Sequence, residues 1–191
     1  ALSTVMGISN GNSNNGYRCV DDWGSARYNT SMQYTGLLYD KMTSSQKYRG
    51  WAEGQMNYLL GSNSMNKCFV VGYNDKSAKY PHHRAASGYT GGPQGTTTQA
   101  HVLTGALVGG PKLNGSYTDS ASDYVCNEVA IDYNATLVAA AAALYSGHAN
   151  ETDTQYVDAD YYVEGTATAW QKPSTVYNGV DYSAVYDYEY Y

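Results

Sequence analysis

The chain has 191 residues, enough for one domain with a sizeable buried core. Its formal net charge is −6 and its basic residues form no cluster, which argues against proteins that bind nucleic acids or anionic membranes. No apolar stretch is long enough to span a bilayer, and no basic leader with an apolar core opens the chain. Because it starts at Ala1, we expect a mature product, a fragment or one part of a larger precursor.

The first third of the chain predicts two helices with a short connection. Residues 4–22 are rich in Gly, Asn and Ser and are predicted to form a loop. Apolar positions at spacings of three and four predict an amphipathic helix over residues 23–42. Ser44 and Ser45 are predicted to cap a second helix that ends near residue 60. Two such helices should pack as an antiparallel hairpin.

The middle of the chain predicts long loops and then a long helix. Residues 62–100 contain only one short apolar run, 68–71, and loops of this length in a compact domain are usually functional. We expect a short helix over His101–Val108, stopped by the Gly-Gly-Pro sequence at 109–111. The main helix is predicted from about Asp123 to Tyr145. No strand alternation is evident, so the body is predicted to be all-α.

The C-terminal segment has a different composition. Residues 149–191 hold eight acidic residues and one basic residue, and nine of the 22 tyrosines lie beyond residue 152. Neither a helical stripe nor clean alternation is present there. We therefore divide the chain into a body, residues 1–148, and an irregular Tyr-rich acidic tail, residues 149–191. Such a tail is either disordered or lies across a surface with its tyrosines as anchors.

Four acidic residues cluster where the main helix is predicted to begin: Asp119, Asp123, Glu128 and Asp132. Glu128 is flanked by apolar residues on a helix that is predicted to be buried on all sides. Desolvation or a neighbouring carboxylate raises a carboxyl pKa, as a general acid near neutral pH requires, whereas a helix N-terminus lowers it. Glu128 is therefore a candidate general acid. The alternative is a helix-entry cluster, with Asp123 near the N-cap and the other acids bonded to the first turn.

A second polar group, Pro-His-His-Arg at residues 81–84, lies in the long loop. His82 and His83 could ligate a metal, but adjacent histidines on a loop seldom reach one ion, and no Cys or carboxylate cluster completes the set. Hydrogen bonding from His82 and Arg84 to hydroxyls or to a carboxylate fits better. The alternative is a loop that Pro81 and Arg84 merely hold in place.

These segments resemble glycoside hydrolase family 9, the cellulase family of endoglucanases and related β-1,4-glucanases. One of the family's two active-site signatures is matched at Tyr117, Asp119, Tyr124, Glu128, Ala130, Asn134 and Ala135. The other is matched at Val70, Val71, Gly72, Pro81, His82 and Arg84, with departures at Cys68 and Asn74. The run from Trp23 to Tyr28 resembles the family's WGS-x-RY helix start. The resemblance covers about residues 4–148.

The resemblance implies the C-terminal portion of an (α/α)6 barrel with long active-site loops. Glu128 would be the general acid, and Asp119 and Asp123 would support the site. The implied sugar-binding residues are His82 and Arg84 at the −1 subsite, Tyr133 near it, Arg27 and Tyr28 near the cleavage point, and Trp23 as a stacking platform. Considered without the resemblance, a tryptophan such as Trp23 is more often a core residue.

The implied function is hydrolysis of β-1,4-glucosidic bonds in cellulose or related β-glucans by an inverting mechanism. The Asp-x-x-Asp segment that supplies the family's general base is absent, and the family's calcium ligands lie largely in the missing part, so no metal or cofactor is expected in this chain. The isolated chain is therefore expected to be inactive. We expect the N-terminal portion of the same enzyme, or self-assembly, to cover the apolar helix wall at 138–144.

The rival hypothesis is a non-catalytic glucan-binding or structural protein derived from a family 9 fragment, with the tail mediating association. A third hypothesis is a cofactor-independent enzyme with another chemistry, but no Ser-His-Asp, Cys-His or phosphate-loop motif in the sequence supports it. Among Cys19, Cys68 and Cys126 at least one is unpaired, and a bridge between the first two is conceivable. The resemblance and four N-x-S/T sequons favour a secreted, extracellular protein.

Overall fold

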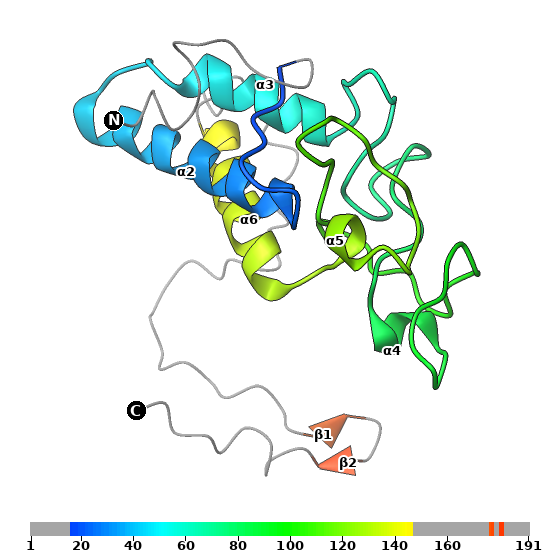
Figure 1. The fold of residues 1–191 in the computed structure, drawn as a ribbon. Coiled ribbons are helices and arrows are strands. Elements are labelled where there is room, and N and C mark those ends of the chain that lie inside the picture. Colours follow the sequence, from blue (N-terminus) through cyan, green and yellow to red (C-terminus); the bar gives the residue numbers. More distant parts are fainter. Residues whose placement is uncertain (1–15, 147–175, 178–179, 182–191) are drawn as a thin grey trace. The chain divides into compact units, whose positions relative to one another are not determined.

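The computed structural model describes residues 16–146, 176–177 and 180–181. The chain separates into two compact units, Ala1–Glu151 and Thr152–Tyr191. In the first unit the described residues form helices joined by long loops, as the sequence predicts (Figure 1). None of the helices in the described ranges has both the length and the apolarity needed to cross a bilayer.

Helix α2 (Ser25–Thr43) and helix α3 (Arg49–Leu59) form the predicted antiparallel hairpin (Figure 1). The connection differs from the prediction, because Ser44 ends α2 in a left-handed conformation instead of capping α3. The capping group for α3 is the buried carboxylate of Asp40, which accepts hydrogen bonds from the backbone N–H groups of Lys47, Tyr48 and Arg49 at 3.0, 2.7 and 2.9 Å. A carboxylate nine residues away in sequence thus satisfies the first donors of the helix.

The main helix of the prediction is broken. A short helix α5 (Tyr124–Asn127) is followed by an extended Glu128, with φ −57° and ψ 143°, and helix α6 (Ile131–Ser146) begins three residues later. The break coincides with a parallel bridge between Glu128 and His82, whose N–H donates to the Asn127 carbonyl at 2.7 Å. Pairing with a distant segment replaces helical hydrogen bonds here, which local periodicity does not reveal.

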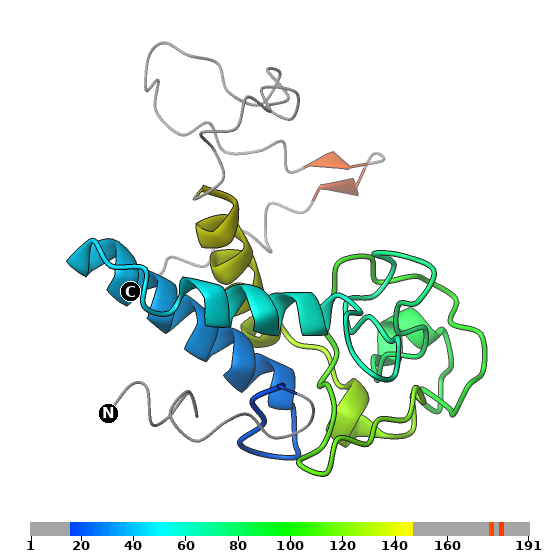
Figure 2. The same ribbon diagram turned by 90° about the horizontal axis from the view of Figure 1, so that it is seen from above.

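Helix α6 packs across α2 and, less extensively, α3 (Figures 1 and 2). Its buried side carries Tyr133, Leu137, Ala140 and Leu144. The opposite side is open: Ile131 is 91% exposed and Val138 is 62% exposed. The prediction that this helix is buried on all sides is therefore wrong for the chain by itself, whereas the predicted exposed apolar wall is present around Val138.

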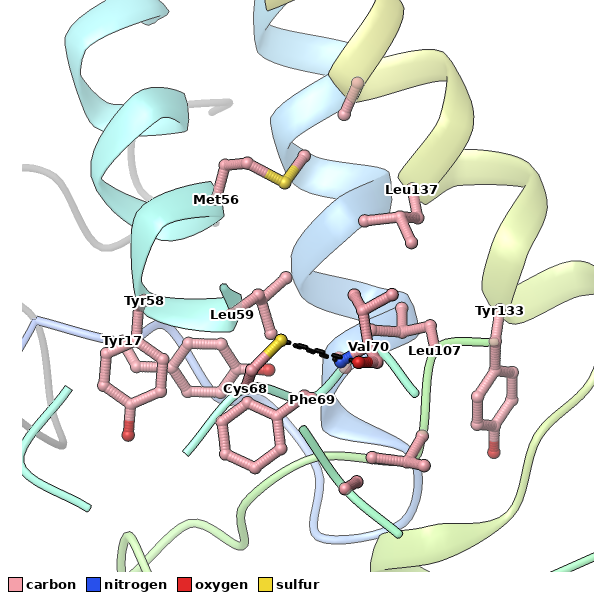
Figure 3. Packing of buried hydrophobic residues seen from close by; sticks show 14 of the residues in the cluster. Tyr17, Met56, Tyr58, Leu59, Cys68, Phe69, Val70, Leu107, Tyr133 and Leu137 are labelled. Carbon is pink, nitrogen blue, oxygen red and sulfur yellow. Dashed lines mark hydrogen bonds between the residues drawn. The ribbon is translucent and has the colours of Figure 1, made fainter. Parts of the chain in front are cut away.

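The core extends from the helices into the loops (Figure 3). Tyr17 stacks on Tyr58 with ring centroids 4.6 Å apart; Phe69 lies parallel to Tyr58 at 6.3 Å and is T-shaped with Tyr117 at 4.9 Å. These rings hold the N-terminal loop and the 68–71 run against the end of α3. The tyrosines in this cluster are core residues, which explains part of the unusual tyrosine content.

The predicted helix at His101–Val108 does not form. Val70 and Leu107 pair in an antiparallel bridge, with bonds from Val71 N to Ala106 O at 2.9 Å and from Val108 N to Phe69 O at 3.0 Å. Leu107 and Val108 are fully buried. The apolar residues of this segment therefore pack against the 68–71 run and do not form one side of a helix. The short helix α4 (Arg84–Ser87) is the helical turn found in the long loop.

In the second unit, β1 (Val176–Tyr177) pairs with β2 (Val180–Asp181) in antiparallel register. This short hairpin was not predicted. The prediction of an irregular, disordered or surface-lying tail otherwise falls outside the described residues. The three cysteines, Cys19, Cys68 and Cys126, are buried free thiols, so the structure does not support the conceivable bridge between the first two.

Candidate active site

Glu128 is half-buried, in the break between α5 and α6. Its Oε2 atom accepts hydrogen bonds from Trp23 Nε1 at 2.9 Å and from the Tyr133 hydroxyl at 3.2 Å. The expectation of an apolar wall around this carboxylate is wrong, because Glu128 follows the end of α5 and the neighbouring Ile131 points to solvent. Its surroundings are instead two aromatic donors and an open side.

Trp23 precedes α2 and is 46% exposed, so the core alternative for this residue is wrong. Its backbone N–H donates to Asp21 Oδ1 at 2.8 Å, and its ring lies against Tyr124 at a centroid distance of 5.2 Å. An exposed indole that is fixed at its backbone and on one side offers a rigid apolar surface, the kind of surface on which sugar rings stack.

Tyr133 is buried, 1% exposed, in the first turn of α6. Burial raises the pKa of its hydroxyl to about 12, the Arg27 guanidinium opposes that rise, and Glu128 adds to it. The phenol is therefore protonated at neutral pH and acts as the donor to Glu128. Gly24 makes room for it, because a Cβ on this residue would clash with the Tyr133 hydroxyl.

Arg27 lies between two tyrosine rings. Its guanidinium carbon is 4.7 Å from the centroid of Tyr28 and 5.0 Å from that of Tyr133. Nη2 donates to the Tyr28 hydroxyl at 3.0 Å, and Nη1 forms a 3.4 Å ion pair with Asp132. Its Nε is buried and has no partner among the described residues. Asp132 was not among the predicted site residues, because its contact with Arg27 joins segments 105 residues apart.

His82 reaches the same region from the long loop. Its Nδ1 lies 2.6 Å from the carbonyl oxygen of Ala121, and its ring meets the Tyr124 ring edge to face at 5.9 Å. Since a carbonyl only accepts, Nδ1 carries the hydrogen, and Nε2 has no hydrogen-bond partner among the described residues. Tyr124, which touches both Trp23 and His82, is a second site residue that the predictions missed. Only its membership of the matched signature singled it out.

Arg84 begins α4 and is exposed; its carbonyl accepts from the Ser87 hydroxyl at 2.7 Å, but its guanidinium has no hydrogen bond or ion pair to another described residue. His83 has a different task from His82: its Nδ1 accepts from the Ala86 N–H at 3.1 Å and so caps α4. The two adjacent histidines are thus used separately. No group of three or more His, Cys, Asp or Glu side chains suited to a metal ion occurs in the described part of the chain.

Asp119 and Asp123 both have structural partners. Asp119 accepts from Lys67 Nζ at 2.6 Å and from the backbone N–H groups of Lys79 and Tyr80 at 3.0 and 3.1 Å. Asp123 caps α5 by accepting from the Cys126 N–H at 3.3 Å. The helix-entry alternative therefore describes Asp123 correctly, whereas Asp119 instead ties the 67–80 loop to the signature segment.

A hollow of about 750 Å³ in the first unit lies beside the Glu128 carboxylate rather than around it. It is a shallow apolar depression over the exposed side of α6 and its preceding linker. Its lining includes Leu103, Ala106, Val129, Ile131 and Val138. The wall that we expected a further segment to cover is therefore continuous with the segment that carries Glu128.

Comparisons with known proteins identify the family of this chain. Residues 2–174 match the family model described as glycosyl hydrolase family 9. Endoglucanase 4 of Bacillus sp. (strain KSM-522) is 35% identical over 176 residues, which cover 88% of this chain and 28% of that protein. Endoglucanase B of Cellulomonas fimi is 43% identical over 135 residues, covering 68% of this chain and 13% of the relative.

Solved structures are similar as well. The catalytic domain of Clostridium thermocellum CelT is 48% identical with a TM-score of 0.69, over 75% of this chain and 29% of that one. The cellulase Cel9M of C. cellulolyticum in complex with cellobiose is 34% identical with a TM-score of 0.69, over 76% of this chain and 34% of that one. The chain thus spans about a third or less of the relatives it matches. Its helices are part of an all-α (α/α)6 barrel, and the chain belongs to glycosyl hydrolase family 9.

Proposed function

We propose that this chain is the acid-bearing C-terminal part of a secreted β-1,4-glucanase that inverts the anomeric centre. Glu128 is the general acid, which protonates the glycosidic oxygen as the bond to C1 breaks. A carboxylate about 6.5–9.5 Å away activates the water that attacks C1 from the opposite face. The observation that carries the proposal is the contact of a half-buried Glu128 with an exposed Trp23, beside His82.

The remaining polar groups have roles in binding. Trp23 stacks on a glucosyl ring in the cleft. Nε2 of His82 and the unpaired guanidinium of Arg84 bind the hydroxyls of the sugar at the −1 subsite. Arg27 and Tyr28 bind the sugar near the cleavage point through donors such as the buried, unpartnered Arg27 Nε. Asp119 and Asp123 act indirectly by holding the loops that carry these groups. The mechanism uses no cofactor in this chain.

The general base and the cover for the apolar side of α6 come from outside this chain. The exposed Ile131 and Val138 support a packing partner at this face. We assign that place to the N-terminal portion of the same enzyme, with self-association as the alternative. The chain by itself is then inactive, because one carboxylate of the pair is missing.

Hydrolysis of carboxymethylcellulose by the native protein that contains this chain tests the proposal, with peptide mapping upstream of Ala1. Replacing Glu128 with Gln should lower the rate by about 10²–10⁴-fold, the usual contribution of a general acid. Glu53→Gln is the matched control, since Glu53 forms a surface pair with Arg49 on α3 and should change nothing. A native protein that binds cellulose but hydrolyses nothing would favour the rival hypothesis, a non-catalytic glucan-binding protein.

A further inference from the structure

Both protein donors to Glu128 meet the same oxygen. Trp23 Nε1 and the Tyr133 hydroxyl each donate to Oε2, at 2.9 and 3.2 Å, and within the described ranges Oε1 has no hydrogen-bond partner. The donors come from different elements, since Trp23 precedes α2 and Tyr133 belongs to α6. The carboxylate is therefore held at one oxygen only.

We propose that Trp23 and Tyr133 are positioning residues that fix Oε2 and so make Oε1 the atom that gives its proton to the leaving group. This inference rests on the proposed role of Glu128 as general acid. A carboxylate oxygen has two lone pairs, and the two donors occupy both on Oε2. The acidic proton accordingly resides on Oε1, because a proton on Oε2 would displace one of the donors.

Neither donor is free to turn away. Tyr133 is buried, and the missing side chain of Gly24 leaves its hydroxyl the space it occupies. Gly24 itself is fixed by its N–H, which donates to the Val125 carbonyl at 3.1 Å. The backbone N–H of Trp23 donates to the Asp21 side chain, and its indole ring packs against the Tyr124 ring. The anchor of the acid is thus built into the folded chain before any substrate arrives.

Trp23 gives this anchor a second consequence. The edge of its indole holds Glu128, while its ring surface is exposed and suited to stacking on a sugar. A glucosyl ring bound on that surface is positioned relative to the same rigid group that positions the acid. Substrate binding and proton delivery therefore share one side chain, and stacking aligns the leaving oxygen with Oε1.

The first test is spectroscopic and needs no activity. In the ¹⁵N-labelled protein, the Trp23 indole N–H signal, assigned by its loss in Trp23→Phe, should shift in Glu128→Gln, because the charged acceptor is gone. It should also shift as Glu128 is protonated in a pH titration, and that pH dependence should vanish in Glu128→Gln. An indole signal that ignores both changes would overturn the inference whether or not the protein is a glucanase.

The second test uses the leaving group. A dinitrophenyl cellobioside needs no protonation on departure, whereas a cello-oligosaccharide does. Tyr133→Phe and Trp23→Phe keep the aromatic rings and remove the donors, and each should lower kcat on the oligosaccharide by about tenfold, the weight of one charged hydrogen bond. On the activated substrate each should change kcat by less than about threefold. Tyr17→Phe, which removes another buried tyrosine hydroxyl, bonded to Ser25, is the control.

The two hypotheses fail differently. If Glu128→Gln affects both substrates equally, the proposed general acid is wrong. If Glu128→Gln spares the activated substrate but the two donor variants lower both rates equally, or lower neither, the acid stands and the positioning role is overturned. A loss confined to KM in Trp23→Phe would likewise reduce Trp23 to a stacking platform.

Discussion

The carboxylate of Asp119 offers a measurable test of whether an acidic residue in the signature segment holds the fold or takes part in the chemistry. It pairs with Lys67 Nζ at 2.6 Å, and the two side chains are only 16% and 22% exposed. It also accepts from the backbone N–H groups of Lys79 and Tyr80. Tyr80 lies two residues before His82 in the sequence. Asp119 therefore secures the segment that delivers His82 to the site.

Asp119→Asn keeps the shape of the side chain and removes its charge. A hydrogen bond between charged groups contributes about 1.5–3 kcal/mol, and the partial exposure of this pair places the expected loss near 2 kcal/mol. Lys67→Met should cost about 1–2 kcal/mol, because the backbone donors still satisfy Asp119. The double variant should then show a coupling energy of about 1 kcal/mol, since both changes remove the same contact.

Urea unfolding of the four proteins, followed by tryptophan fluorescence, measures the coupling, and KM for a cello-oligosaccharide reports the position of His82. We expect KM to rise in both single variants while kcat on an activated substrate changes little. If the losses of unfolding free energy in the two single variants simply add in the double variant, the stabilising contact between Asp119 and Lys67 is refuted. An unchanged stability combined with a loss of kcat in Asp119→Asn, but not in Lys67→Met, would place Asp119 in the chemistry itself.

Three further predictions follow from the geometry. Burial raises the pKa of Asp40, but its hydrogen bonds from Ser45 and three backbone N–H groups outweigh burial and leave that pKa lowered. Asp40→Ala should therefore cost about 2–4 kcal/mol at neutral pH. This difference in unfolding free energy should shrink as pH falls below about 4, because the Asp40 carboxyl of the unfolded chain, whose pKa is not lowered, then binds a proton before the native one does. A pH-independent difference would contradict this reasoning. Gly24→Ala should lower the free energy of unfolding by at least about 1–2 kcal/mol, because the φ of Gly24 is +63°. The added methyl group should also displace Tyr133 from Glu128 and so shift the Trp23 indole signal. An unchanged signal would exclude the close approach of Gly24 to the Tyr133 hydroxyl. Burial raises the pKa of the Cys126 thiol to about 12, so a thiol reagent at pH 8 should label no cysteine in the native protein and three after unfolding, and fewer than three would reveal a disulfide.

Local sequence patterns were sufficient for several features of this protein. Apolar spacing predicted α2, α3 and most of α6, since one face of each is buried against the others. Two signature segments drew attention to Glu128 and His82, which the structure brings together through a backbone bridge. The all-α fold class and the family also follow from the sequence, because both depend on short-range patterns.

The tertiary structure decided where those patterns fail. The apolar pattern of residues 101–108 predicts a helix, yet Leu107 pairs with Val70 in the structure. Burial against residues 68–71 stabilises this segment more than the hydrogen bonds of a short isolated helix would. The main helix breaks at Glu128 because the backbone there pairs with the His82 segment. Ser44 ends one helix rather than starting the next, since Asp40 already satisfies the donors of α3.

The atomic arrangement of the site depends most on the fold. Trp23 Nε1 meets Glu128 Oε2 across 105 residues of sequence, and Gly24 leaves the space that Tyr133 fills. Residue spacing records which side of a helix is apolar, but not which distant side chain will lie opposite it. The sequence by itself determined which groups this protein carries, and the packing of α2, α5 and α6 determined that two of them hold one oxygen of a third and leave its other oxygen free.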